Sequence, residues 1–98
     1  MLVRNVFVDV DDTLVRSAGP KRIPMPQVVA KVRELHAQGC VLYLWSTGGA
    51  VYAEQAAAEL GLTACFAAYL PKPDLYIDDQ PILEWRACKH LHPAQVSD

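Results

Sequence analysis

The chain has 98 residues, of which 52% are hydrophobic, and its formal net charge at pH 7 is −2. This length and apolar content predict one globular domain spanning residues 1–98 and exclude a disordered chain. The slightly acidic balance argues against a general nucleic-acid binder, which normally carries a strongly basic surface.

The first predicted strand, Leu2–Val10, has a nearly unbroken apolar end, which is typical of a central strand covered on both faces. The segment Val15–Met25 follows as a loop, and the stretch from Thr13 to Arg33 holds several Lys and Arg residues but no acidic one. A basic segment beside carboxylates suits an anionic substrate, although a solvated loop explains these charges equally well.

The predicted elements then alternate between helices and strands. Apolar residues at helical spacing from Val28 to Leu35 predict a helix that stops at Gly39. The next predicted elements are a strand buried on both faces, Cys40–Trp45, and a helix that ends at Gly61, Ala50–Leu60. Two further strands, Cys65–Ala68 and Leu75–Asp78, and a last helix, Pro81–His90, complete the chain.

This alternation predicts an α/β fold, a small open parallel sheet of the Rossmann-like kind with helices on both faces. The connection Tyr69–Asp74 is shorter than the roughly 10 residues of a normal parallel crossover. The third strand is therefore expected to be short, irregular or antiparallel.

Carboxylates follow two of the predicted strands. Asp9 and Asp11 lie on one side of the first strand near its end, and Asp78 and Asp79 close the fourth. Because ligands bind beyond the carboxyl ends of parallel strands, neighbouring strands would bring these oxygens to one Mg²⁺ site. The alternative for the first cluster is a simple turn, since Asp and Thr bond their own backbone in turns.

A hydroxyl pair and a lysine could hold a phosphate in the same crevice. Ser46 and Thr47 end the second strand just before two glycines and a helix, where free N–H groups face a ligand. An ordinary helix N-cap explains a Ser or Thr there equally well. Lys72 lies between two prolines and could point at the crevice, although a lone loop lysine is usually solvated.

With Asp9-x-Asp11-x-Thr13, Ser46, Lys72 and Asp78-Asp79 in this order, about the first 80 residues resemble the haloacid dehalogenase superfamily of phosphohydrolases and phosphotransferases. The resemblance implies a haloacid-dehalogenase-like core and a Mg²⁺-dependent phosphatase that forms an aspartyl-phosphate intermediate. The short Val15–Met25 segment implies a member without a cap domain, a type that tends to act on phosphate groups of large molecules or to use a neighbouring subunit as its lid.

The resemblance also implies the role of each residue. Asp9 would be the nucleophile and Asp11 the acid–base residue, while Ser46, with Thr47 beside it, and Lys72 would hold the phosphoryl group. Asp79, assisted by Asp78, would bind Mg²⁺ together with Asp9 and the backbone carbonyl of Asp11. The family helix that carries the Lys is missing here, so Lys21 or Arg22 would be fallback cations if Lys72 cannot reach the site.

Two other functions remain open on the sequence. A non-catalytic module of the same fold could bind a metal or a phosphate and regulate a partner. A phosphoacceptor receiver domain also combines acidic residues, a hydroxyl and a lysine, but the order of these residues along the chain disagrees with it.

The remaining signals concern the compartment and partners. An odd number of cysteines, the absence of a leader-like N-terminus and apolar runs far short of the roughly 20 residues that cross a bilayer predict a cytoplasmic protein with reduced thiols and no membrane contact. Cys88, His90 and His92 could attract a soft metal, but the end of a helix explains them better. The expected partner is a phosphorylated substrate, and a homo-oligomer stays open.

Overall fold

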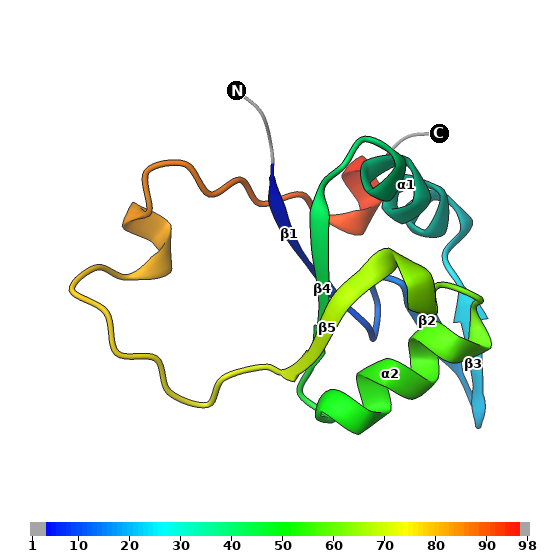
Figure 1. Cartoon of the computed structure of the whole chain (residues 1–98). Coiled ribbons are helices and arrows are strands. Elements are labelled where there is room, and N and C mark those ends of the chain that lie inside the picture. Colours follow the sequence, from blue (N-terminus) through cyan, green and yellow to red (C-terminus); the bar gives the residue numbers. More distant parts are fainter. Residues whose placement is uncertain (1–3, 97–98) are drawn as a thin grey trace.

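The computed structural model describes residues 4–96, and its centre is a parallel sheet of three strands (Figure 1). The strands are β1 (Asn5–Asp9), β4 (Val41–Ser46) and β5 (Phe66–Pro71), arranged in the order β1-β4-β5. Each neighbouring pair is parallel, with Asn5 opposite Val41 and Ser46 opposite Pro71. The predicted small parallel α/β sheet is confirmed, and it is compatible with a Rossmann-like core. Residues 2 and 3 of the predicted first strand lie outside the described residues.

The third strand starts later than the sequence predicted and is parallel rather than antiparallel, and its pairing with β4 is irregular, as expected, with a register shift between Leu42 and Tyr43. Cys65 belongs to a short 3₁₀ turn, η1 (Thr63–Cys65), and β5 continues to Pro71, past the predicted end at Ala68. This longer strand leaves three residues between its end and Leu75. A parallel crossover needs a dozen or more residues, so a fourth strand cannot follow immediately.

Two helices connect the strands close to where the apolar spacing predicted them. α1 (Pro26–Ala37) begins with Pro26, whose fixed φ suits a first helical position, and it is followed by Gly39 at a φ of 89°. α2 (Ala50–Glu59) buries a stripe of small residues, Ala53, Ala56 and Ala57. These short side chains let α2 pack closely on β4 and β5.

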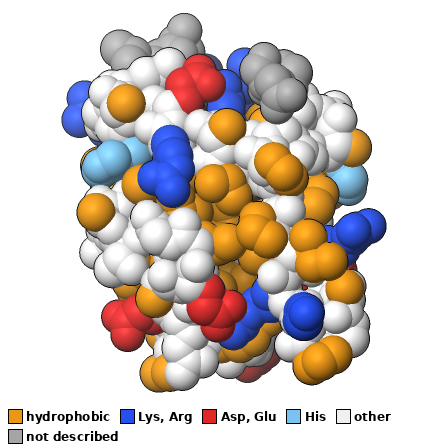
Figure 2. Space-filling model, turned by 90° about the vertical axis from the view of Figure 1, so that its right-hand side faces the viewer, with side chains coloured by type: hydrophobic (Ala, Val, Ile, Leu, Met, Phe, Trp, Pro, Cys, Tyr) orange, Lys and Arg blue, Asp and Glu red, His pale blue; other side chains and the backbone are white. Residues whose placement is uncertain are grey.

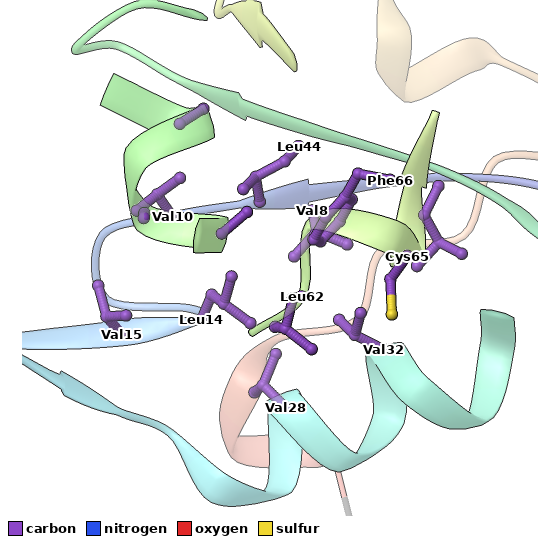
Figure 3. Packing of buried hydrophobic residues seen from close by; sticks show 14 residues of the cluster. Val8, Val10, Leu14, Val15, Val28, Val32, Leu44, Leu62, Cys65 and Phe66 are labelled. Atoms are coloured by element: carbon purple, nitrogen blue, oxygen red, sulfur yellow. The ribbon is translucent and has the colours of Figure 1, made fainter. Parts of the chain in front are cut away.

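Both helices pack on the same face of the sheet, so the prediction of helices on both faces is wrong for the described residues (Figure 1). Val8, Leu42 and Leu44 point from the sheet into one hydrophobic cluster with residues of α1 and α2. Figure 3 shows Val28 and Val32 of α1 facing Leu62 and Val8 in this cluster. Burial of these aliphatic side chains is the main stabilising contribution to the fold.

The opposite face of the sheet carries aromatic side chains. Phe7 stacks on Tyr43 at a ring-centroid distance of 4.8 Å and meets Trp45 edge-on at 4.9 Å. Phe7 remains 48% exposed. The continuous apolar sequences of β1 and β4 predicted that both faces of these strands would be covered. In the structure only one face is covered by helices, and on the other face the aromatic rings pack against one another.

The basic segment after β1 folds into a hairpin that the sequence did not predict. β2 (Val15–Ala18) and β3 (Lys21–Pro24) are antiparallel, with Ala18 opposite Lys21. Gly19, at a φ of 61°, lies in the tight connection. The hairpin packs on the helix side of the molecule rather than forming a free loop (Figure 1).

The predicted strand Leu75–Asp78 and helix Pro81–His90 do not form. The chain after Pro71 instead runs in a wide loop away from the sheet, with only the short 3₁₀ turns η2 (Ile82–Glu84) and η3 (Pro93–Gln95) (Figure 1). Leu75, Ile77 and Leu83 are 78%, 93% and 98% exposed. Val96 returns to pack against the hydrophobic cluster.

The short connection described above is the physical reason for this outcome, since it keeps Leu75–Asp78 away from the edge of the sheet. Within residues 4–96, β1 pairs with β4 alone and its other edge is open. None of the helices in this range has both the length and the apolar character needed to span a membrane.

Candidate functional site

The carboxyl end of β1 turns sharply and gathers polar side chains. The Val10 carbonyl accepts the amides of Leu14 and Val15 at 3.0 and 3.1 Å, and the Asp12 N–H donates to the Val15 carbonyl at 2.7 Å. Asp12 has a φ of 60°, a left-handed conformation that Asp tolerates better than most residues. The Thr13 hydroxyl then donates to Oδ2 of Asp9 at 3.2 Å.

Lys72 reaches the other oxygen of Asp9. Its Nζ lies 3.3 Å from Oδ1 of Asp9. The backbone explains this placement, because β5 ends opposite Ser46 and the Lys72 N–H donates to the Ser46 carbonyl at 2.9 Å. Lys72 therefore starts at the same edge of the sheet as the end of β1, and both side chains are partly shielded from solvent. The fallback cations Lys21 and Arg22 are not needed for this contact.

Asp11 has a separate partner. The hydroxyl of Tyr52, in the first turn of α2, donates to Oδ1 of Asp11 at 2.6 Å. This hydrogen bond and, second, burial raise the pKa of Tyr52 above its usual value. The two aspartates that follow β1 thus have different environments, a cation for Asp9 and a neutral donor for Asp11.

Tyr52 is a site residue that the sequence did not single out. Its position near the start of the helix after Ser46 was the available signal. Ala53, Ala56 and Ala57 of the same helix are buried, whereas Tyr52 is only partly buried.

Arg22 of the hairpin connects Tyr52 to the far end of α2. Its guanidinium carbon lies 4.7 Å from the centre of the Tyr52 ring. Arg22 also pairs with both oxygens of Glu59, Nε to Oε1 at 3.1 Å and Nη2 to Oε2 at 2.6 Å. The hydrogen bond to Glu59 is the main cause that raises the pKa of Arg22. This pair attaches the hairpin to α2.

Ser46 is buried at the end of β4, and its hydroxyl oxygen accepts the N–H of Gly48 at 2.9 Å. The N-cap of α2 is Gly49, with no side-chain cap, so the alternative that Ser46 caps the helix is wrong. Thr47 is exposed in this turn. A Cβ on Gly48 would lie 3.0 Å from Cδ2 of Tyr52, so the turn and the tyrosine pack tightly.

Asp78 and Asp79 are exposed on the C-terminal loop and are not gathered with the other candidate residues. Oδ1 of Asp78 accepts the Gln80 N–H at 3.0 Å. In residues 4–96, no three Asp, Glu, His or Cys side chains are grouped in a way that could hold a metal ion. The arrangement as it stands therefore does not fit the predicted four-aspartate Mg²⁺ site.

The Cys88, His90 and His92 sequence is also exposed. Nδ1 of His92 accepts the Ala94 N–H at 3.0 Å and caps η3. The helix end that was expected here is absent, and within the described range these residues form no candidate metal group.

Comparison with known proteins places the chain in a family. A family model described as "Protein of unknown function (DUF705)" matches residues 2–72, a stretch that holds Asp9, Asp11, Ser46 and Lys72. Neither the curated proteins nor the solved structures contain a match. Because the matched segment covers most of the sequence, the chain belongs to the DUF705 family of proteins of unknown function.

Proposed function

We propose that the protein is a phosphohydrolase of phosphate monoesters that forms an aspartyl-phosphate on Asp9 and has a haloacid-dehalogenase-like core. The observation that carries the proposal is the contact of Lys72 with Asp9 at the carboxyl end of the sheet, 3.3 Å between Nζ and Oδ1. Ligands of open parallel sheets bind at this edge. The order of motifs along the chain, described above, supports the same reaction.

Asp9 is the nucleophile in this proposal. One of its oxygens attacks the phosphorus atom, and the ester P–O bond breaks. The cation of Lys72 and the Thr13 hydroxyl hold the carboxylate in place, and Lys72 offsets the repulsion between this carboxylate and the anionic phosphate. A carboxylate nucleophile divides one difficult displacement into two easier ones.

Asp11 moves the proton. In its protonated form it gives a proton to the leaving oxygen, and it then takes a proton from the water that attacks the aspartyl-phosphate. This second step releases inorganic phosphate and restores the Asp9 carboxylate. The Tyr52 hydroxyl, 2.6 Å from Oδ1, orients the carboxyl group for both transfers.

Ser46 and Thr47 would face the phosphoryl oxygens from the turn between β4 and α2. The free amides at the start of α2 lie in the same turn and favour an anion. The Ser46 hydroxyl accepts the Gly48 N–H, which leaves its own proton as a donor toward the phosphate.

Mg²⁺ is a further part of the proposal, with Asp9, Asp11, Asp78 and Asp79 as its ligands. A divalent cation at this position would neutralise charge that develops on the transferring group. Because Asp78 and Asp79 are not gathered with Asp9, these residues would hold the metal only after the loop that follows Pro71 moves toward the carboxyl end of β1. No step above depends on the metal's geometry.

The test is turnover of phenyl phosphate by the purified chain, with and without millimolar Mg²⁺. Asp9→Asn should abolish turnover, and acid quenching with labelled substrate should trap a phosphoenzyme in the wild type only. Asp12→Asn is the matched control, since it removes a neighbouring carboxylate, Asn tolerates the left-handed φ, and activity should persist. Equal turnover by wild type and Asp9→Asn would contradict the proposal.

The second candidate is a non-catalytic module of the same fold that binds a phosphate, because the carboxylates that would hold a catalytic metal are scattered within the described residues. The same experiment separates the two functions. Binding of inorganic phosphate by calorimetry, without turnover and without a trapped phosphoenzyme, would support the module.

A further inference from the structure

A hollow of about 290 Å³ lies between the hairpin and α2. Its walls come from the end of β2, the connection, the start of β3 and the tyrosine of α2: Ser17, Gly19, Pro20, Lys21, Arg22 and Tyr52. This volume is just below the roughly 300–1,000 Å³ of small-molecule pockets, and the hollow is open to solvent. It is large enough for one small group of a bound molecule.

The hollow is connected to the candidate site through a shared side chain. Tyr52 lines it, and the hydroxyl of Tyr52 is bonded to Oδ1 of Asp11. In the proposed reaction, Asp11 protonates the oxygen of the leaving group. The leaving group must therefore lie on the Asp11 side of the phosphorus, next to the hollow.

The charges around the hollow indicate which charge a bound leaving group should carry. Lys21 and Arg22 line it, and it contains no acidic wall residue. The Glu59 carboxylate neutralises Arg22 from outside the hollow, whereas Lys21 is exposed in the hairpin. Figure 2, which faces this side of the molecule, shows basic side chains in its lower half, with acidic ones beside some of them. A cationic wall attracts an anionic group.

We propose that this hollow binds the leaving group of the substrate, and that this group is a small alcohol or phenol carrying a second anionic group such as a carboxylate. Lys21 contacts that anion, and the Tyr52 ring packs against the carbon skeleton. The proposal rests on the phosphohydrolase function and adds the substrate class to it.

The test compares two substrates that differ only in the second anion, 4-carboxyphenyl phosphate and phenyl phosphate. We expect the wild type to have the higher kcat/KM for the carboxylated ester. Lys21→Ala should lower the ratio of the two kcat/KM values by roughly two- to five-fold, the upper part of the range for one solvent-exposed charge contact. Added NaCl should lower the wild-type ratio as well.

Arg16→Ala is the matched control. It removes the same charge from the same hairpin, but Arg16 does not line the hollow. This variant should keep the wild-type ratio. An equal drop of this ratio in Arg16→Ala and Lys21→Ala would show that the positive charge of the whole hairpin attracts the substrate. That result would overturn the proposed binding site.

The outcomes also separate this inference from the function on which it rests. Absence of turnover for both esters contradicts the phosphohydrolase itself. Turnover of both esters with the same kcat/KM, unchanged by Lys21→Ala, leaves the phosphohydrolase standing and overturns the anion-binding hollow.

Discussion

At the scale of single residues, the candidate site depends on which partner each aspartate has. Asp9 lies between Lys72 and Thr13, and Asp11 accepts the hydroxyl of Tyr52. Lys72 places a cation beside Asp9, whereas Tyr52 gives Asp11 a neutral hydrogen-bond donor that orients its carboxyl group. This difference suits a nucleophile at Asp9 and a proton carrier at Asp11.

Gly48 offers a test of Tyr52 as a positioning residue. A Cβ at this position would lie 3.0 and 3.1 Å from two ring atoms of Tyr52. Gly48→Ala should therefore displace the ring, weaken the bond to Asp11 and lower kcat by about ten-fold, a part of the roughly 10²–10⁴-fold that general acid–base catalysis contributes. Val51→Ala, at an exposed position one residue before Tyr52, should keep the wild-type kcat.

Titration of Tyr52, measured by tyrosinate absorbance, distinguishes a loss of positioning from a general structural defect. In Gly48→Ala the pKa of Tyr52 should fall toward its ordinary value, because its hydrogen bond to Asp11 is the largest cause of the increase. A lowered kcat with an unchanged tyrosinate titration would argue against positioning.

Alkaline pH tests the same bond through stability. The raised pKa of Tyr52 means that the folded state favours the neutral phenol, while in the unfolded chain the phenol titrates near 10.0. The stabilisation is thus complete below about pH 10 and is lost as the pH rises through the folded-state pKa. In urea melts, Tyr52→Phe should lose less stability than the wild type as the pH rises above about 10.

Tyr69 also makes stability fall at alkaline pH, because its pKa is raised in the folded state, mainly by burial. The double variant Tyr52→Phe/Tyr69→Phe should therefore show the weakest dependence on alkaline pH. A single variant Tyr52→Phe with the full wild-type pH dependence would contradict the role given to its bond with Asp11.

At the scale of elements, the main feature is the contrast between the sheet and the loop after it. β5 ends at Pro71 and delivers Lys72 to Asp9, but the same length prevents an immediate fourth strand. Leu75 and Ile77 are left exposed while the outer edge of β1 is open within the described residues. The three-residue connection keeps the exposed apolar segment from pairing with that edge as a parallel strand, so both stay uncovered within the described residues.

Metal binding should couple to the order of this loop. If Asp78 and Asp79 join Asp9 on Mg²⁺, the amides of residues 75–79 should exchange more slowly with solvent when Mg²⁺ is added. Hydrogen exchange followed by mass spectrometry measures this change without any turnover. Asp79→Asn should remove the protection, whereas Asp74→Asn, a carboxylate in the same loop outside the proposed ligand set, should retain it. Identical exchange with and without Mg²⁺ in the wild type would contradict the ligand set.

At the scale of the whole molecule, the two faces of the sheet differ in burial. Leu42 and Leu44 are enclosed by α1 and α2, whereas Phe7, Tyr43 and Trp45 form an aromatic cluster on the other face. Stability should therefore depend mainly on the face that carries the helices.

Paired truncations measure this asymmetry. Leu44→Ala, at a fully buried position, should cost about 2–5 kcal/mol in the free energy of unfolding. Phe7→Ala should cost less, about 1–2 kcal/mol, because the ring is half exposed and loses mainly its aromatic contacts. Urea denaturation gives both values, and a larger cost for Phe7→Ala would show that the aromatic face is covered in solution.

The sequence alone determined the parts of this protein that depend on local patterns. Continuous apolar runs located β1 and β4, helical spacing and glycines located α1 and α2, and strand ends located Asp9, Asp11 and Ser46, because each signal lies within a few residues of its element.

Only the tertiary structure decided which distant groups meet. Three contacts join residues that lie 37 or more positions apart: Lys72 with Asp9, Tyr52 with Asp11 and Arg22 with Glu59. No local sequence pattern predicts contacts over such separations. It likewise decided that Leu75–Asp78 is a loop, because an apolar run becomes a strand only where the connection lets it reach a sheet edge.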